Sequence, residues 1–419
     1  MRIELIMKDK GVNNLLYNWN SKLLDKTSKY FICDESLRDG LQDVSVPSLS
    51  LKDKLNYIDS VEKLGIERID LGFASSNEKA FNEILEMFKH IQNSNYKVKP
   101  YCAARTLVKD IAPIVEIQDI VGSQLGVATF LGCSPIRRLV ENWDKKYLLE
   151  QSMKAIEYSL NNKLDVAFVA EDLTRSKPED IEELFLSAKQ LGCNRFVLAD
   201  TVGTLNPSGV ENIVNWTRKL KGFSEDETIL EWHGHNDRGY GLINALQALE
   251  SGCQGAHGTI MGIGERAGNT ALDLLVLNLY LQDEFEGNID HLVPYVLNNV
   301  EKFGLSISDN YPLLGDNAFV TSSGVHASAI LKSFELESNS QYVSDYIYSC
   351  VPATKFGLEQ NIKINNMSGK SNVLFWAKRN NLEVNDMFIE QVLNEANNQK
   401  EFLPDSKLFS IYDEVCNCG

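Results

Sequence analysis

Two histidines one residue apart, His233 and His235, have a spacing that can support metal chemistry. If the residues before them form a strand, the two imidazoles lie on the same side of it, because side chains along a strand alternate with a period of two. Two imidazoles on one side can hold one metal ion. The alternative is a pair of hydrogen-bonded histidines at a strand end, so the remaining ligands must be sought elsewhere in the chain.

Further metal ligands are available in two stretches that lie far apart in the sequence. Asp39 belongs to DESLRDGLQ at 34–42, and Asn269 ends the glycine-rich GIGERAGN at 262–269. Nitrogen and oxygen ligands with positions left open suit Mg²⁺, Mn²⁺ or Zn²⁺ acting as a Lewis acid on a bound keto group, not a closed structural zinc site. Arg38, next to Asp39, is placed to balance negative charge that develops on a neighbouring carbonyl oxygen.

A regular alternation of elements after Tyr30 must position these side chains. Short apolar or β-branched runs alternate with longer amphipathic ones, which is the pattern of βα units around a parallel sheet. The eight predicted strands are Tyr30–Cys33, Ile66–Gly72, Val98–Ala103, Leu125–Phe130, Asp165–Val169, Arg195–Ala199, Thr228–His233 and Gly255–Met261. Eight units over about 250 residues predict an α/β fold of the (β/α)8 TIM-barrel type. The runner-up is an open doubly wound sheet, but the first βα turn lacks the GxGxxG phosphate loop expected there.

The ends of the helices and of the barrel are also marked in the sequence. Ser50 and Ser176 are predicted helix N-caps, and Gly65 and Gly192 are predicted C-terminal stops. The alternation ends near Asp283. We therefore expect an N-terminal arm over residues 1–29, a TIM barrel over 30–283 and a smaller, mainly helical C-terminal region over 284–419.

Polar residues accumulate at the predicted C-terminal strand ends, where a barrel enzyme assembles its active site. They are Arg38, Asp39, Arg105, Thr129, Glu171, Asp172, Arg175, Asp200, Thr201, His233 and His235. A purely structural role does not readily explain why so many polar, chemically capable residues lie at these strand ends. For Asp172 and Asp200, the alternative is a helix N-cap or a buried ion pair.

The composition limits the possible partners and the cellular location. With 58 acidic and 41 basic side chains the formal net charge is −17, which disfavours nucleic acid and anionic membranes as partners. No apolar run approaches the ~20 residues that span a bilayer, and MRIELIMKDK is not a signal peptide, so we expect a cytoplasmic protein. The eight cysteines are scattered. Most should be reduced and buried, and Cys416 and Cys418 should belong to a frayed tail.

The motifs together carry a family likeness that spans residues 34 to 332. The sequence resembles the metal-dependent acyltransferases and lyases that include 2-isopropylmalate synthase, homocitrate synthase, citramalate synthase and hydroxymethylglutaryl-CoA lyase. The matching stretches are DESLRDGLQ at 34–42, FVAEDLTRS at 168–176, LADTVG at 198–203, HGHNDRG at 233–239, GIGERAGN at 262–269 and SSGVHASAILK at 322–332.

The resemblance implies roles for residues within the predicted barrel and for residues in the region that follows it. The implied metal ligands are Asp39, His233, His235 and Asn269. Arg38 and Glu171 are implied as catalytic residues, and Thr201 as a ligand for the carboxylate of a keto acid. His326 and Tyr348 are implied as catalytic residues from the region after the barrel, which in the synthases reaches across a homodimer to help handle acetyl-CoA.

The reaction class follows from the glycine-rich turn. In the lyases the GERAGN turn is replaced by a loop with a catalytic cysteine, whereas here no cysteine occurs between Cys253 and Cys350. This favours a synthase, in which acetyl-CoA and a 2-oxo acid undergo a Claisen condensation and the thioester is then hydrolysed to release CoA. The alternatives are lyase-like or aldolase-type cleavage of a carbon–carbon bond, and a non-catalytic relative.

The acceptor is the least determined part of the expected reaction. Ala128, in ATFLGCS, stands where synthases of the leucine pathway usually carry histidine, which argues against 2-oxoisovalerate. Four arginines are available to bind a second carboxylate, as in homocitrate synthesis: Arg105, Arg137, Arg138 and Arg175. GERAGN is nevertheless closer to the leucine-pathway form, and an aromatic or unusual acceptor is also open. The chain stops before a C-terminal feedback domain, so no leucine inhibition is expected.

Overall fold

The computed structural model describes residues 30–336 and 340–416, which fall into two compact units. One unit runs to Ser306 and the other begins at Ile307. The predicted arm over 1–29 lies outside the described residues.

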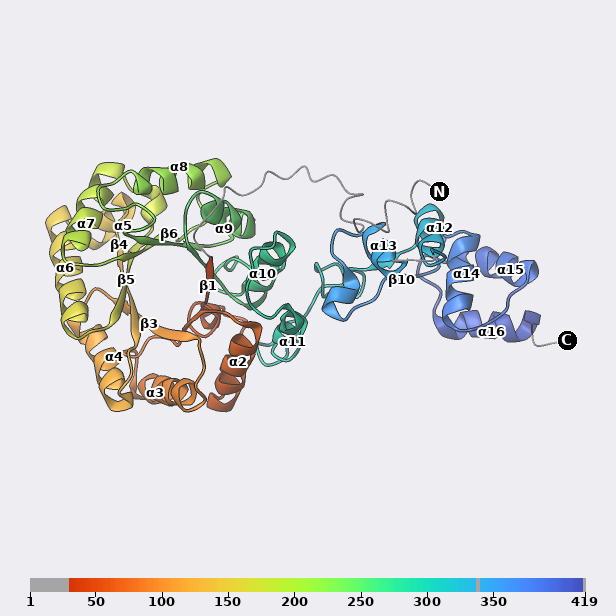
Figure 1. Cartoon of the computed structure of the whole chain (residues 1–419), viewed down its shortest axis with the longest axis horizontal. Helices are drawn as coiled ribbons and strands as arrows, with labels where there is room; N and C mark the ends of the chain where they lie inside the picture. Colours follow the sequence, from red (N-terminus) through yellow and green to blue (C-terminus); the bar gives the residue numbers. More distant parts are fainter. Residues whose placement is uncertain (1–29, 337–339, 417–419) are drawn as a thin grey trace. The chain divides into compact units, whose positions relative to one another are not determined.

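The first unit is a closed barrel of parallel strands, as the sequence predicts (Figure 1). Its strands are β1 (Phe31–Asp34), β2 (Arg68–Asp70), β3 (Lys99–Arg105), β4 (Gly126–Gly132), β5 (Asp165–Glu171), β6 (Arg195–Asp200), β7 (Ile229–Gly234) and β8 (Gly255–Gly258). Phe31 pairs with Gly255, so β1 and β8 close the ring. Every predicted strand overlaps an observed one. β8 is shorter than predicted because a short 3-10 turn at Ile260–Gly262 follows it, with Met261 at φ 51°.

Helices surround the strands of the barrel (Figure 1). They are α2 (Leu51–Leu64), α3 (Glu78–Asn93), α4 (Val108–Val121), α5 (Pro135–Glu141), α6 (Lys145–Asn161), α7 (Pro178–Gln190), α8 (Pro207–Arg218), α9 (Gly241–Glu250), α10 (Leu272–Leu281) and α11 (Leu292–Leu297). Ser50 caps α2, and Gly65 ends it in the left-handed conformation at φ 87°, as predicted. Ser176 does not cap α7: Lys177 holds the N-cap position without a side-chain cap. Pro178 at the first helical position has no N–H that needs one.

The barrel unit continues past Asp283 to Ser306, because α10 and α11 pack onto it. Tyr295 of α11 is buried, and its hydroxyl donates to Asp34 Oδ2 at 2.8 Å. Tyr57 of α2 donates to the same oxygen at 2.6 Å. A buried carboxylate at the end of β1 thus ties α11 to the barrel.

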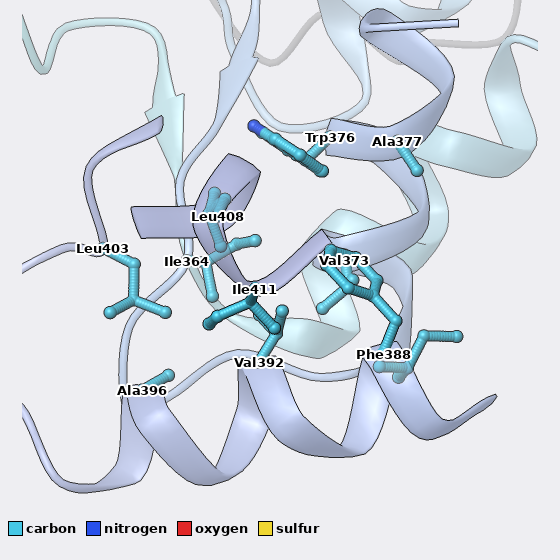
Figure 2. Packing of buried hydrophobic residues seen from close by; sticks show 11 residues of the cluster. Ile364, Val373, Trp376, Ala377, Phe388, Val392, Ala396, Leu403, Leu408 and Ile411 are labelled. Carbon is cyan, nitrogen blue, oxygen red and sulfur yellow. The ribbon is translucent and has the colours of Figure 1, made fainter. Parts of the chain in front are cut away.

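The second unit is mainly helical. It contains α12 (Gly324–Ser333), α13 (Ser340–Tyr346), α14 (Lys370–Arg379), α15 (Asp386–Asn397) and α16 (Asp405–Cys416), with a parallel pair β9 (Val320–Thr321) and β10 (Asn361–Ile362). Trp376, Phe388, Val392 and Ile411 form the centre of an apolar core between the last three helices (Figure 2). The predicted helical C-terminal region is confirmed.

Most of the described cysteines are buried, as predicted, but Cys416 belongs to a helix and not to a frayed tail. Five cysteines are buried: Cys33, Cys102, Cys133, Cys193 and Cys253. Cys350 is exposed, and Cys416, partly buried, ends α16, while Cys418 lies outside the described residues. Among the described residues, no helix is long and apolar enough to cross a membrane.

Candidate metal centre

His233 and His235 lie at the C-terminal end of β7 with both rings buried. Their Nε2 atoms are 3.3 Å apart. The strand alternation therefore places both imidazoles on one side, as the sequence predicts.

Asp39 joins the two histidines from the loop that follows β1. Its Oδ2 lies 3.2 Å from His233 Nε2 and 3.6 Å from His235 Nε2. Ligand atoms of the three residues all lie within 4.8 Å of one another. Asp39 Oδ2 and His235 Nδ1 are among the buried polar atoms of the described residues that lack a hydrogen-bond partner. A buried carboxylate oxygen without a donor beside two imidazole nitrogens fits a divalent cation.

Burial and charge keep this set of ligands in the protonation states that bind metal. Burial lowers the pKa of His235 to about 4, and the neighbouring His233 adds to the effect. Burial likewise lowers the pKa of His233. Burial would raise the pKa of Asp39, but Arg38 and His233 outweigh it and hold the pKa well below its ordinary value. At neutral pH the site thus presents two neutral imidazoles and one carboxylate.

Asn269 is held next to His235 by the glycine-rich turn. The main chains of His235 and Asn269 form an isolated antiparallel bridge, and Asn269 Nδ2 donates to Ile263 O at 3.1 Å. A Cβ at Gly264, where φ is 149°, would lie 2.2 Å from Asn269 Nδ2. Glycine at this position is therefore needed for the turn to place Asn269 beside the histidines.

Arg38 is fixed beside Asp39 by carboxylates. Its Nε donates to Asp70 Oδ2 at 3.0 Å, its Nη1 lies 3.4 Å from Asp39 Oδ2, and Glu35 forms an ion pair with it. Burial lowers the Arg38 pKa, but Asp39 and Asp70 more than compensate and raise it. The guanidinium thus stays charged at the edge of the candidate metal centre.

The sequence reasoning missed two residues beneath this site, Glu35 and His257. Glu35 Oε1 accepts from Tyr101 at 3.0 Å and lies 2.6 Å from His257 Nδ1, and the other ring nitrogen lies 2.9 Å from Glu231 Oε2. Burial would lower the pKa of His257, but Cys33 and Glu231 beside it raise the value to about 9. Glu231 lies on the same inward-facing side of β7 as His233 and His235, because side chains along a strand repeat every two residues. This spacing was the sequence signal for Glu231, the partner of His257.

A cavity of about 220 Å³ opens above these residues. It brings together six residues predicted from the sequence: Arg38, Asp39, Glu171, Thr201, His233 and His235. Burial raises the pKa of Glu171, and the nearby Arg137 opposes this shift. Thr201 Oγ1 accepts from the Asp172 amide at 2.8 Å, which leaves its hydroxyl hydrogen available as a donor.

Four predicted substrate-binding residues do not line this cavity. They are Arg105, Thr129, Arg138 and Arg175. Thr129 is buried on the other face of β4, because its neighbours Ala128 and Phe130 face the cavity.

The three arginines are engaged by carboxylates. Arg105 contacts Asp110 through Nε at 2.5 Å and Nη2 at 3.2 Å. Arg138 donates to Asp180 at 2.8 Å, and Arg175 binds both oxygens of Asp172 at 2.8 and 2.6 Å.

Asp172 and Asp200 are likewise occupied within the fold. Asp172 binds Arg175 as described, and Asp200 Oδ1 accepts from the Thr174 hydroxyl at 2.7 Å and from the Thr204 amide at 2.8 Å. Asp172 thus forms the ion pair of the structural alternative, whereas Asp200 instead accepts hydrogen bonds from a hydroxyl and from main-chain amides of the following loop.

His326 and Tyr348 are brought together in the second unit. Their ring centroids are 4.0 Å apart with an interplanar angle of 29°, so the rings stack. Both side chains are exposed.

Comparisons with known proteins agree with the barrel and the motifs. A family profile described as HMGL-like matches residues 29–297. A homocitrate synthase from Methanocaldococcus jannaschii is 29% identical, over 92% of this chain and 90% of that protein. A putative (R)-citramalate synthase from Archaeoglobus fulgidus is 33% identical over 73% of this chain, which spans 60% of that protein. Among solved structures, the hydroxymethylglutaryl-CoA lyase from Pseudomonas aeruginosa has a TM-score of 0.57 at 19% identity, over 67% of this chain and 94% of that one. That likeness concerns the fold.

Proposed function

The chain belongs to the HMGL-like family, and from this premise we propose that it condenses acetyl-CoA with a 2-oxo acid in a Claisen reaction. The observation that carries the proposal is the cluster of Asp39, His233 and His235 at the mouth of the barrel, with Arg38 and Glu171 in the same cavity. Similarity to proteins named homocitrate and citramalate synthases supports this reaction class.

The metal part of the proposal assigns ligands within the cluster. Asp39, His233 and His235 would hold a divalent cation such as Mg²⁺, Mn²⁺ or Zn²⁺, and we propose the Asn269 amide oxygen as a further ligand. When bound, the ion supplies Lewis-acid polarisation of the acceptor's keto group. Neutral imidazoles and an ionised carboxylate are the protonation states that such a site requires.

Arg38 and Glu171 provide the charge and the proton transfer in this proposal. The guanidinium of Arg38, held by Asp70 and Glu35, stabilises negative charge on the oxygen of the reacting carbonyl. The raised pKa of Glu171 brings its carboxyl closer to neutral pH, which suits a group that accepts a proton from the acetyl methyl. The methyl carbon then forms a bond to the keto carbon, and water hydrolyses the thioester to give the acid and free CoA.

Thr201 and the second unit complete the assignment. The Thr201 hydroxyl would donate to the 2-oxo acid's carboxylate. We propose that the stacked pair of His326 and Tyr348 helps to handle acetyl-CoA, and that the enzyme is a cytoplasmic homodimer. The support for this part is the resemblance of SSGVHASAILK to the synthases.

Release of free thiol from acetyl-CoA tests the proposal. The full-length protein is stripped with a chelator, reloaded with Mg²⁺, Mn²⁺ or Zn²⁺, and assayed against a panel of 2-oxo acids. We expect CoA release that depends on both the acceptor and the metal. If no combination of acceptor and metal in the panel gave CoA release, the proposed condensation would be refuted.

A further inference from the structure

We propose that the acceptor is a monocarboxylic 2-oxo acid with an apolar side chain. The inference rests on the condensation proposed above and specifies its substrate class. The feature that carries it is the wall that β3, β4, β5 and β6 contribute to the cavity, together with the ion pairing of every arginine near that cavity. The wall is formed by Ala103, Ala128, Phe130, Val169, Val197 and Ala199.

These side chains form a continuous apolar surface. Phe130 on β4 is in register with Val169 on β5, which is in register with Val197 on β6. Side chains in register on neighbouring parallel strands point to the same face of the sheet, so these three lie next to one another on the inner face of the barrel. Ala103 and Ala128 pair in the same way on β3 and β4 and add a row of small side chains.

The apolar wall begins beside the metal ligands. Ala199 on β6 is in register with His233 on β7. An acceptor whose keto and carboxylate groups occupy the metal centre and Thr201 therefore directs its remaining carbons along alanine, valine and phenylalanine side chains. Each methylene that is buried against such a wall favours binding.

The charged groups around the cavity offer no partner to a second carboxylate. Arg38 and Arg266 are the arginines that line it, and no lysine of the described chain does. Arg38 is held by carboxylates, and Arg266 lies 2.9 Å from Asp237 Oδ1 and donates to Thr201 O at 2.6 Å. Glu35 and Glu171 also line the cavity and add negative charge.

The arginines that the sequence offered for a second carboxylate are occupied as well. Each of the four pairs with a carboxylate of the protein and lies outside the cavity lining: Arg105 with Asp110, Arg137 with Glu141, Arg138 with Asp180 and Arg175 with Asp172. A distal carboxylate on the acceptor would lose its water without gaining a hydrogen-bonded cation, which is strongly unfavourable. The geometry thus argues against the dicarboxylic acceptor, which was one of the alternatives that the sequence left open.

Acceptors matched in shape provide the test. The first pair is 4-methyl-2-oxopentanoate and oxaloacetate, and the second is 5-methyl-2-oxohexanoate and 2-oxoglutarate; within each pair an isopropyl group replaces a carboxylate. With the metal-loaded full-length protein we expect kcat/KM for CoA release to favour the apolar member by about 100-fold or more. Equal or greater activity with the dicarboxylic member would overturn this inference while the condensation stands. If none of the 2-oxo acids gave CoA release, the condensation itself would instead be refuted.

Two valine variants test the wall directly. Val197→Ala enlarges the cavity, and Val127→Ala removes the same atoms from the outward face of β4, where the side chain is also buried. We expect Val197→Ala to lower the ratio of kcat/KM for 4-methyl-2-oxopentanoate over pyruvate by about 10-fold, and Val127→Ala to leave this ratio unchanged. If Val197→Ala does not fold, the same ratio is measured for Val169→Ala, because the Val169 side chain is only partly buried. An unchanged ratio in the folded inward-facing variant would contradict the proposed wall.

Discussion

Two buried charged clusters lie along β7, and they differ in how completely their hydrogen bonds are satisfied. In the lower one, Glu231 Oε1 accepts from Arg195 Nε at 2.8 Å and Nη2 at 2.5 Å, and Oε2 contacts His257 at 2.9 Å and Cys33 at 3.6 Å. Arg195 Nη1 donates to Asp165 at 2.8 Å. In the upper cluster, Asp39 Oδ2 is buried beside two imidazoles and makes no hydrogen bond.

This difference separates a structural role from a binding role. Burial would raise the pKa of Glu231, but Arg195 and His257 hold it well below the ordinary value, so this carboxylate is charged and fully paired. Paired charges of this kind keep a fold together, because the loss of one partner leaves the other unsolvated. The Oδ2 of Asp39 has no hydrogen bond and lies within 3.6 Å of both Nε2 atoms, which is an arrangement that fits a bound cation.

The largest expected effect is on activity, at the upper cluster. His233→Ala should lower kcat/KM for CoA release by about 10³-fold or more, because a metal ion that polarises a carbonyl contributes several kcal/mol. Circular dichroism should show an intact barrel. His90→Ala is the matched control, since His90 lies on α3 and pairs with Asp59. Unfolding of the His233 variant would show that the upper cluster also has a structural role, contrary to the proposed difference between the two clusters.

A stability effect of nearly the same size is expected at the lower cluster. Glu231→Leu should reduce the free energy of unfolding by about 3–5 kcal/mol, because the buried Arg195 loses its bidentate partner. Denaturant titration measures this. Glu150→Leu removes an exposed partner of Lys146 and should cost no more than ~1 kcal/mol. Similar losses in both variants would show that the lower cluster is not a structural anchor.

Metal addition should stabilise the protein only through the upper cluster. At 100 times the dissociation constant, the ion should add about 2.7 kcal/mol to the free energy of unfolding of the chelator-treated protein. The same addition should leave His233→Ala unchanged. Equal stabilisation of both proteins, measured by thermal melting, would place the ion elsewhere.

The smallest expected effect concerns Glu35, which connects the clusters through Arg38 and His257. Tyr101→Phe removes one hydrogen bond to Glu35 Oε1 and should cost about 1 kcal/mol of stability. Metal affinity, followed by calorimetry, should stay within about threefold of the wild-type value. A large loss of metal affinity would mean that the two clusters are coupled more tightly than their bonding pattern indicates.

Much of the fold and half of the site follow from local patterns. The alternation of apolar runs predicts the barrel, because a strand or helix must bury one face regardless of what covers it. The period of a strand puts His233 and His235 on one side, and the position of Asp39 after the first strand brings it to the same mouth. The short β8 and the uncapped start of α7 depend on single-residue conformations, which these patterns do not resolve.

The partners of the charged side chains required the tertiary structure. The sequence offers Arg105, Arg138 and Arg175 as substrate-binding residues, but in the structure each forms an ion pair with a carboxylate of the protein. Glu35 and His257 meet across the closure of the barrel between β1 and β8. Periodicity determines which face a residue occupies, because it is a property of the local backbone. Pairing depends on which groups meet in space with compatible charge, and only the packed barrel determines that.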